Sequence, residues 1–467
     1  MRKTVITAAL AAGTFILASP TPARDLDHGQ DPQSGAPGAA VQRAAFSPLH
    51  SLRPVLRPVL RPQPGPALRG TTAAQRGPKP RPETLVSAMS PEADDAARFA
   101  RWRQEFRARA LAQGIAPAVF DDAFYGLTRD PEVIRRDRNQ AEFTKTIWDY
   151  LDSAVSPTRI ANGRSALAAH RATLDRIETR YGVEKEIVTA IWGLESAFGA
   201  FRGSNSTIRS LATLAFDARR SDFFETQLLA ALQILQAGDI SAGQMQGSWA
   251  GAMGHTQFMP TSYLEHAVDF TGDGRRDIWS DDPTDALAST AAYLNHFGWK
   301  TGQPWGVEVL LPEGFDYRLA DRAITRAPSE WARLGVRGTD GRAVPDHGPA
   351  SVLLPAGREG VALLVFDNFA VLERYNSADA YVIGVGHLAD RIAGGDGFRG
   401  GWPRGDRALS LAERMELQER LTRAGFDTRK IDGKIGPLTI NAVRAYQLAN
   451  GLPADGYASL QLLNRLR

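Results

Sequence analysis

The chain has 467 residues, which is more than a single hydrophobic core supports, so we expect two or three domains. Its 55 Lys and Arg residues against 52 Asp and Glu residues give a net charge of +3, too small to indicate nucleic acid as a partner of the whole molecule. The lack of cysteine excludes disulfides, thiolate metal sites, cysteine nucleophiles and a lipid-modified N-terminal cysteine.

The first residues have the pattern of a secretory signal peptide. Met1-Arg2-Lys3 is followed by a mostly apolar stretch from Val5 to Ala18 and by small residues up to Ala23. Because this stretch is shorter than the roughly 20 residues that cross a bilayer, we interpret residues 1–23 as an export signal. We therefore expect a soluble periplasmic protein without a membrane anchor.

Residues 24–86 are rich in Pro, Gly, Ala and Arg and contain a short repeat between Leu52 and Pro62. About eight basic residues and no acidic ones lie between Val41 and Pro82, so the basic character of the chain belongs to this arm. Such a composition predicts a disordered, semi-extended linker. An arm that binds an anionic polymer of the cell envelope is the alternative.

Helical patterns dominate residues 87–396. They begin at Pro91, where acids occupy the first turn, and they continue through residues 116–124, 143–151, 167–181 and 377–392. Short β-branched and apolar runs at residues 307–311, 351–354 and 361–366 predict a small sheet inserted between the helices. The fold class that we predict is α+β and mainly helical.

One carboxylate stands on an apolar helical face. The segment from Glu184 to Phe198 has helical spacing, which places Glu195 on the same face as Val188 and Ile191. Partial desolvation favours the protonated form of such a carboxyl group, as a general acid in glycoside cleavage requires. The alternative is a structural ion pair with a nearby arginine.

The segment from Gly247 to Tyr263 is rich in small residues interrupted by polar and aromatic ones. Glycines let a backbone approach a bulky ligand, and Ser248, His255 and Gln257 could hydrogen-bond to a sugar. Close packing of the chain around buried aromatic residues is the alternative.

A loop with acidic residues follows. Asp269, Thr271 and Asp273 occupy the first, third and fifth positions of an EF-hand pattern that reaches Arg275, with glycine at the sixth. The twelfth position is Ser280, where a bidentate Glu is expected. The alternative is a metal-free acidic turn.

After a break rich in Gly and Pro, residues 406–465 predict a small three-helix domain. Asp432-Gly-Lys-Ile-Gly-Pro-Leu-Thr439, Ala442-Val-Arg-Ala-Tyr-Gln447 and Gly451-Leu-Pro-Ala-Asp-Gly456 resemble the small peptidoglycan-binding domain common on cell-wall enzymes. A structural cap is the alternative.

Four segments of the larger domain also carry a resemblance. Gly193-Leu-Glu195-Ser-Ala-Phe-Gly199, Gly247-Ser-Trp-Ala-Gly-Ala-Met-Gly254, Gln257-Phe-Met-Pro-Thr-Ser-Tyr263 and Arg374-Tyr375-Asn376 together resemble the signature of the lytic murein transglycosylase B family. The similarity runs from about residue 90 to residue 395. It implies a lysozyme-like helical core that acts on the glycan strands of peptidoglycan.

The resemblance also implies roles for particular residues. Glu195 becomes the single catalytic acid and base, and Ser248 and Gln257 lie beside the muramic acid. The residues along the saccharide groove are Arg219, Arg220, Tyr293, Tyr375 and Asn376. The implied calcium site is closed by Asp285, so its candidate residues are Asp269, Thr271, Asp273, Arg275 and Asp285.

The implied reaction is not a hydrolysis. Glu195 protonates the oxygen between N-acetylmuramic acid and N-acetylglucosamine and then accepts the proton of the muramic C6 hydroxyl, which leaves a 1,6-anhydromuramic end. The nucleophile belongs to the sugar, so neither Asp217 nor Glu225 is needed as a second carboxylate. No cofactor is required for catalysis, and calcium is a candidate structural ion.

The leading hypothesis is thus a lytic transglycosylase of cell-wall remodelling. Peptidoglycan strands are its expected partner, and other cell-wall enzymes are further candidates. The alternatives are a catalytically silent peptidoglycan-binding scaffold and a hydrolytic muramidase. A calcium-regulated adhesion protein rests on the acidic loop alone and ranks below them.

Overall fold

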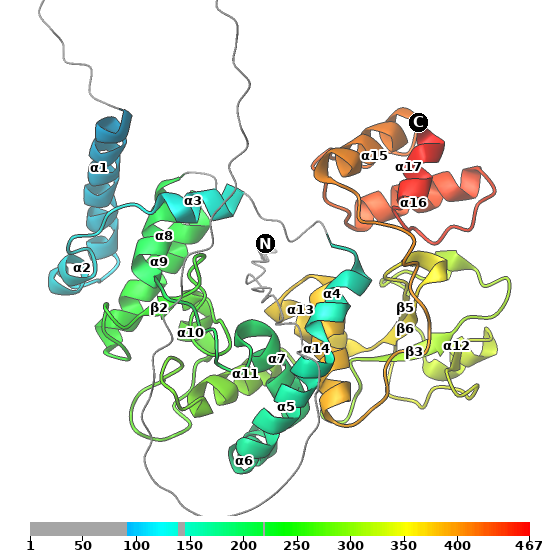
Figure 1. The fold of residues 1–467 in the computed structure, drawn as a ribbon, viewed down its shortest axis with the longest axis horizontal. Coiled ribbons are helices and arrows are strands. Elements are labelled where there is room, and N and C mark those ends of the chain that lie inside the picture. The colour runs from blue at the N-terminus through cyan, green and yellow to red at the C-terminus, as the bar shows by residue number, and fades with distance from the viewer. Residues whose placement is uncertain (1–90, 139–144, 218–219) are drawn as a thin grey trace, which may run out of the picture. The chain divides into compact units, whose positions relative to one another are not determined.

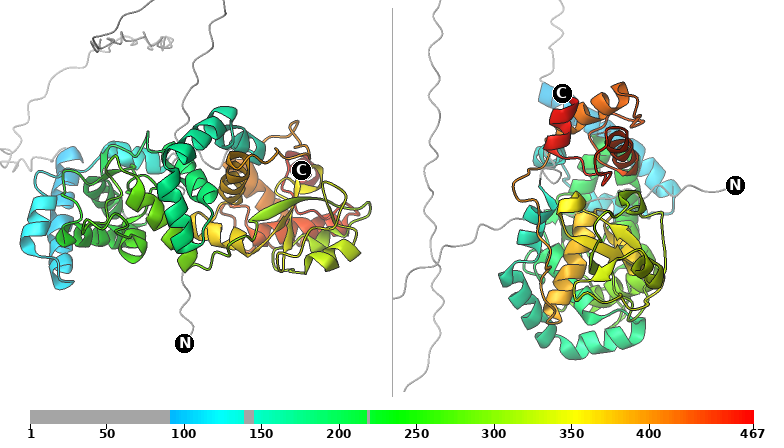
Figure 2. Two further views of the ribbon diagram at one scale, coloured as in Figure 1. Left: turned by 90° about the horizontal axis from the view of Figure 1, so that it is seen from below. Right: turned by 90° about the vertical axis from the view of Figure 1, so that its right-hand side faces the viewer.

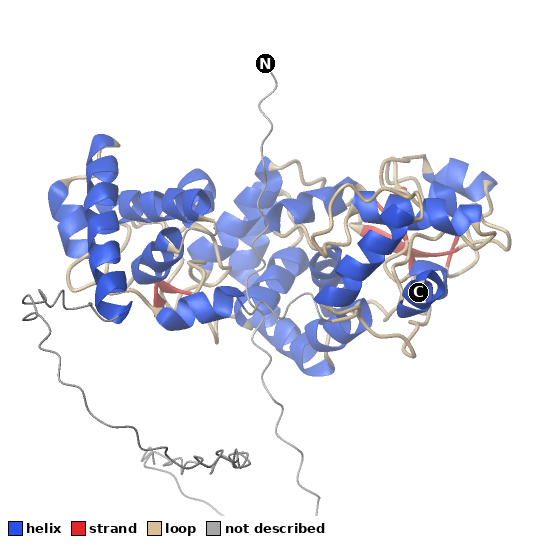
Figure 3. Cartoon of the chain, turned by 90° about the horizontal axis from the view of Figure 1, so that it is seen from above, coloured by secondary structure: helices blue, strands red, loops and turns tan. Residues whose placement is uncertain are grey.

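The computed structural model describes residues 91–138, 145–217 and 220–467 (Figure 1). The predicted signal peptide, the predicted linker and Arg219 lie outside the described residues. Within them the chain is mainly helical, and its strands gather at two separate places (Figure 3). No helix in these ranges is both long enough and apolar enough to cross a membrane.

The helices that precede the larger sheet form the first part of the domain. They are α1 (Pro91–Ala112), α2 (Pro117–Ala123), α3 (Pro131–Arg138), α4 (Ile147–Ala154), α5 (Pro157–Ala169), α6 (Arg171–Tyr181), α7 (Lys185–Ser196), α8 (Thr207–Phe216), α9 (Ser221–Ala237), α10 (Pro260–His266) and α11 (Thr284–His296). A two-stranded antiparallel sheet of β1 (Asn205–Ser206) and β2 (Gln246–Gly247) lies among them.

One predicted helix is two helices in the structure. The sequence pattern predicted a continuous helix over residues 167–181, but the chain leaves the helical conformation at His170, whose φ and ψ are −107° and 19°. The continuous prediction is wrong at this point, because the apolar spacing persists across a break that only the backbone reveals.

Helix α7 occupies the centre of the main core. It packs against α5, α6, α11 and the later helix α14 (Asp379–Ile392), as Figure 1 shows. Every residue from Ile187 to Leu194 is buried. A helix that is apolar around its whole circumference belongs inside a core. The main core therefore holds the helix that carries Glu195 in a fixed place.

The inserted sheet lies between two cores. Its strands lie in the yellow-green to yellow part of the chain (Figure 2). Their antiparallel order is β4-β3-β6-β5, with β3 at Gly306–Leu310, β4 at Arg337–Gly338, β5 at Ser351–Leu353 and β6 at Ala362–Val365. Along β6, Leu363 and Val365 join the main core, whereas Ala362 and Leu364 join a second core around Trp331. Alternate side chains of a strand point to opposite faces, so an uninterrupted apolar run marks a strand buried on both sides.

The remaining helices close the domain and form the C-terminal unit. Helix α12 (Pro328–Arg333) belongs to the inserted region, and α13 (Asp367–Tyr375) leads to α14. The C-terminal unit consists of α15 (Leu411–Arg423), α16 (Pro437–Ala449) and α17 (Leu460–Leu466), with a separate core around Leu417, Val443 and Leu463. The predicted fold class, mainly helical with an inserted β region and a small helical C-terminal domain, is confirmed.

Candidate active site

Glu195 lies in the last turn of α7 and is half-buried. Val188 and Ile191, which share its helical face, are completely buried, and Trp192 is almost so. The sequence-based placement of this carboxylate on an apolar face therefore agrees with the structure. A carboxyl group in such surroundings is shielded from bulk water without being sealed from it, as proton transfer to a bound substrate requires.

The backbone turns sharply after Glu195. Three successive residues, Ala197, Phe198 and Gly199, have φ of 49°, 61° and 85°, in the left-handed region that side chains other than glycine rarely adopt. The sequence pattern predicted helix up to Phe198, so this prediction is wrong by two residues. The hydroxyl of Ser196 bridges the turn, accepting from the Gly199 N–H at 3.0 Å and donating to the His255 carbonyl at 2.5 Å.

Two tyrosines lie beside the carboxylate. The hydroxyl of Tyr381, in the first turn of α14, donates to Glu195 Oε1 at 2.6 Å. Tyr375 donates to the carbonyl of Thr256 at 2.6 Å. Burial raises the pKa of both tyrosines well above its ordinary value, and the charge of Glu195 raises it further. Both hydroxyls therefore stay protonated and remain hydrogen-bond donors throughout the working pH range.

The glycine-rich segment folds back on itself. Ser248 is buried, and its Oγ accepts from the N–H groups of Ala250 and Ala252 at 3.3 Å and 3.1 Å. A Cβ atom on Gly247 would lie 2.1 Å from the Ala252 carbonyl oxygen. The glycine here permits contact between two backbone segments, and Trp249 and Phe258 are buried, so close packing explains much of the composition of this segment.

Gln257 is half-buried in this fold. Its φ is 54°, and its Nε2 donates to the carbonyls of Gly254 and Arg202 at 2.8 Å and 3.0 Å. Because Tyr375 holds the adjacent Thr256, the structure brings Gln257 into the same neighbourhood as Tyr375. A strained backbone at a residue that the resemblance assigns to the sugar is typical of a functional site.

The remaining predicted saccharide residues fall into two groups. Tyr293 packs against Tyr375 with ring centroids 5.2 Å apart, and Asn376 is buried and accepts from the Ala378 N–H at 3.1 Å. Arg220, in contrast, forms an ion pair with Asp137 at 2.5 Å. The structure thus groups Tyr293 and Asn376 with Tyr375, and it shows Arg220 in an internal ion pair.

His255 is not placed to bind a sugar. It is 3% exposed, and both ring nitrogens are within hydrogen-bonding distance of protein atoms, Trp192 Nε1 and the Ser280 carbonyl. The expectation that this side chain contacts sugar hydroxyls is therefore wrong: burial removes it from any surface that a glycan can reach.

The acidic loop is held by hydrogen bonds from its own backbone. Asp269 accepts from the N–H groups of Gly272 and Gly274 at 2.6 Å and 2.8 Å. Asp285 accepts from Phe270, Thr271 and Asp277 at 2.9–3.0 Å, so it braces the loop from α11. Among the residues that the structure describes, no group of three or more His, Cys, Asp or Glu side chains is close enough to hold a metal ion.

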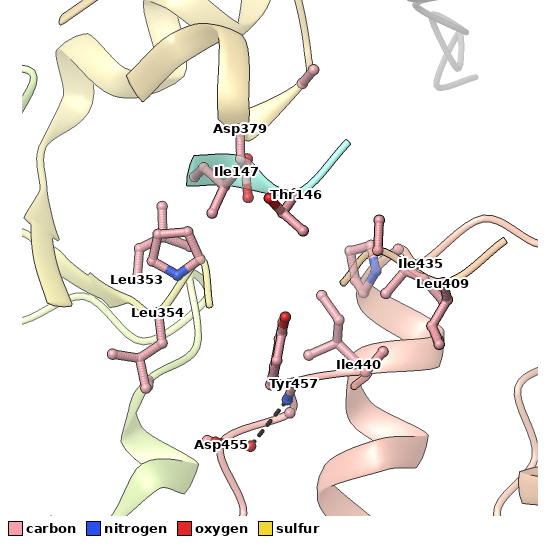
Figure 4. A pocket seen from close by; sticks show the side chains of 18 of the residues that line it. Thr146, Ile147, Leu353, Leu354, Asp379, Leu409, Ile435, Ile440, Asp455 and Tyr457 are labelled. Carbon is pink, nitrogen blue, oxygen red and sulfur yellow. Dashed lines mark hydrogen bonds between the residues drawn. The ribbon is translucent and has the colours of Figure 1, made fainter. Parts of the chain in front are cut away.

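A cavity of about 600 Å³ lies elsewhere, between the C-terminal unit and the inserted sheet region (Figure 4). Asp379 and Tyr457 line it, but Glu195, Tyr375 and Tyr381 do not. We therefore assign the chemistry to the hydrogen-bonded cluster around Glu195 and not to this cavity.

Comparison with known families places this cluster within a recognised domain. A family model described as a transglycosylase SLT domain matches residues 98–390, and a model of a peptidoglycan binding domain matches residues 410–466. This chain belongs to the SLT-domain transglycosylase family. The sequence-based recognition of a lytic transglycosylase with a C-terminal peptidoglycan-binding domain is thereby confirmed.

Several relatives are known. The chain is 32% identical over 251 residues to membrane-bound lytic murein transglycosylase B of Escherichia coli (strain K12), which covers 52% of this chain and 66% of that relative. It is 50% identical to SltB3 from Pseudomonas aeruginosa, crystallised in complex with NAG-anhNAM-pentapeptide, with a TM-score of 0.77 over 79% of this chain and 99% of that one. Escherichia coli Slt35 in complex with calcium is 28% identical, with a TM-score of 0.54 over 62% and 92% of the two chains.

The match spans slightly less than two thirds of that curated relative's length. Sequence reasoning missed Tyr381, the residue that contacts Glu195. A tyrosine six residues after Tyr375, at the start of an otherwise apolar helix, was the available signal.

Proposed function

We propose that this transglycosylase is an exported lytic enzyme of the periplasm. It cleaves the β-1,4 bond between N-acetylmuramic acid and N-acetylglucosamine in peptidoglycan and leaves 1,6-anhydromuramic ends. The observation that carries the proposal is the half-buried Glu195 held by the hydroxyl of Tyr381 at 2.6 Å. The complex of its relative SltB3 with an anhydromuramic ligand supports the same product here.

The chemistry needs a single carboxyl group. Protonated Glu195 gives its proton to the glycosidic oxygen, the bond to the muramic C1 breaks, and N-acetylglucosamine leaves as an alcohol. The resulting carboxylate accepts the proton of the C6 hydroxyl while that oxygen bonds to C1, which restores Glu195 to its starting form. Ring closure is intramolecular, so the nucleophile needs no recruitment from solvent.

The contacts of the other candidate acids support this single-acid chemistry. Asp217 forms an ion pair with Arg138 at 3.0 Å, and Glu225 forms one with Arg109 at 2.7 Å. Each of these two carboxylates is therefore already held in an ion pair with an arginine.

Digestion of purified sacculi tests the product. We expect muropeptides that end in anhydromuramic acid, each lighter by one water than the corresponding reducing-end product in a mass spectrum. Reducing ends without anhydro ends would show a hydrolytic muramidase instead.

We also propose that the acidic loop binds calcium weakly and structurally, by a rearrangement that gathers carboxylates which do not form a metal-holding group in the described residues of this structure. Its oxygen donors have the chemistry that calcium prefers, and the relative Slt35 was crystallised with calcium. The proposed residues are Asp269, Thr271, Asp273 and Asp285, through their side chains, and Arg275, through the backbone carbonyl that the seventh position of an EF-hand loop supplies. Burial raises the pKa of the Asp285 carboxyl, and the nearby charge of Asp269 also raises it, so a bound cation would relieve the cost of ionising Asp285.

Calorimetric titration of the purified protein with calcium chloride tests this site. We expect a calcium-dependent heat and a higher melting temperature, because an ion that binds the folded state stabilises it. The Asp269→Asn variant keeps one of the two oxygen acceptors for the loop N–H groups but loses the charge, so both effects should weaken. If the wild type shows neither a calcium-dependent heat nor a higher melting temperature, the proposed calcium site is wrong.

The C-terminal domain is proposed to hold the enzyme on its insoluble substrate. A tethered binding unit raises the local concentration of the active site along the polymer without adding contacts to it. Association with other cell-wall enzymes remains a further proposal, to be tested by co-purification with the full chain.

A further inference from the structure

His255 contacts the catalytic helix on both sides of Glu195. The indole N–H of Trp192, one turn before Glu195, donates to His255 Nδ1 at 3.1 Å. Ser196, the next residue after Glu195, donates its hydroxyl to the His255 carbonyl at 2.5 Å. One residue outside α7 thus makes hydrogen bonds with α7 both before and after Glu195.

The opposite side of His255 is attached to the segment that closes the acidic loop. Its backbone N–H donates to the Ile278 carbonyl at 3.1 Å, and its ring Nε2 lies 2.7 Å from the Ser280 carbonyl. Gly199 packs directly on the ring, since a Cβ there would lie 2.6 Å from it. The ring thus has little room to rotate or to be replaced by a larger one.

These partners determine the position of the ring proton. The indole of Trp192 can only donate, so Nδ1 must accept, and the Ser280 carbonyl can only accept, so Nε2 must carry the proton. The ring is therefore neutral in this arrangement. Arg202 Nη1, 3.2 Å from Nε2, also donates to the Ser280 carbonyl, at 2.5 Å, and its positive charge disfavours a second proton on the ring.

We infer that His255 is a positioning residue for the proposed reaction: in its neutral Nε2–H form it fixes the last turn of α7, and with it Glu195, against the segment at Ile278–Ser280. It touches neither substrate nor reacting atoms. This inference rests on the proposed function for its catalytic consequence, but the bond between His255 and Trp192 can be tested without catalysis.

Protonation of His255 should release this attachment. A proton on Nδ1 would turn the acceptor of the Trp192 bond into a donor and place a second cation beside Arg202. The charged and titratable groups around the ring are Arg202, Asp277, Asp281, Asp282 and, beyond Trp192, His170. Burial lowers the pKa of His255 below its ordinary 6.5, and Arg202 also lowers it, so the neutral form persists at neutral pH.

Tryptophan fluorescence of the full chain during acid titration tests the bond. A protonated imidazole quenches an indole that it touches, so we expect quenching below pH 6.5 in the wild type. The Trp192→Phe and His255→Gln variants should lack that component. His170→Gln, a change at the other histidine whose ring packs against Trp192, is the matched control and should keep it.

Kinetics test the positioning role. His255→Ala removes both ring hydrogen bonds without enlarging the side chain, and we expect kcat at neutral pH to fall about tenfold with KM unchanged. His255→Gln can still donate to the Ser280 carbonyl and cannot become charged. It should therefore restore part of kcat. The wild type should lose activity over the pH range in which its fluorescence is quenched, whereas His255→Gln should not.

A quenching step that persists in His255→Gln, or that is absent from the wild type, would overturn the assignment of the bond. A raised KM with unchanged kcat in His255→Ala would indicate substrate contact and overturn the positioning role. Should the wild type yield no anhydro product, the proposed function fails while the fluorescence experiment still decides the bond.

Discussion

Replacing Glu195 with Gln is expected to lower kcat for release of anhydromuropeptides by about 10³-fold or more, because the amide can neither give nor regain the proton on which bond cleavage depends. The side chain keeps its shape and can still accept from Tyr381, so the melting temperature should change little. Rates of product formation from sacculi, measured by mass spectrometry, check this.

Glu186→Gln is the matched control, since it makes the same change in the first turn of the same helix. It should retain nearly full activity. The comparison also tests the scaffold hypothesis: a silent binding protein would release no product before or after the Glu195 change and would bind sacculi equally well in both forms.

Replacing Tyr381 with Phe should lower kcat by roughly 10- to 100-fold, the range that corresponds to losing one hydrogen bond to a charged group. The ring still fills the core at the start of α14, but the carboxyl group of Glu195 loses the donor 2.6 Å away that orients it. KM should change less than kcat, because Tyr381 acts through Glu195. Initial rates over a range of solubilised glycan concentrations separate the two constants.

Tyr263→Phe provides the control for this change. Tyr263 is also fully buried, and its hydroxyl donates to the Arg276 carbonyl at 2.6 Å. Both variants lose one buried hydrogen bond, so their melting temperatures should fall by similar amounts. Equal losses of kcat in the two variants would contradict a specific role for Tyr381.

The sequence was sufficient to place the catalytic candidate. The apolar spacing of α7 puts Glu195 on a buried face. The short, uninterrupted apolar run Ala362–Val365 identifies a strand of the inserted sheet. These features depend on residues close together in the chain, where the spacing of apolar residues indicates which face is buried.

What the sequence could not predict depends on contacts between distant segments or on backbone conformation. Tyr381 lies 186 residues from Glu195, and nothing in its local pattern distinguishes it from a tyrosine that only fills the core. The left-handed turn at Ala197 and Phe198 contradicts local propensity and exists because surrounding contacts enforce it. His255 has ring nitrogens that could bind a sugar, yet it is buried and cannot be reached by one.

In the mechanism that we propose, Glu195 directs the C6 hydroxyl of the muramic acid, and not water, to the reacting carbon. Digestion of sacculi by the wild type in water enriched in ¹⁸O tests it most directly. We expect new anhydro ends that carry no label from the solvent. New ends that contain ¹⁸O from the first turnover onward would show that water is the nucleophile and would contradict it.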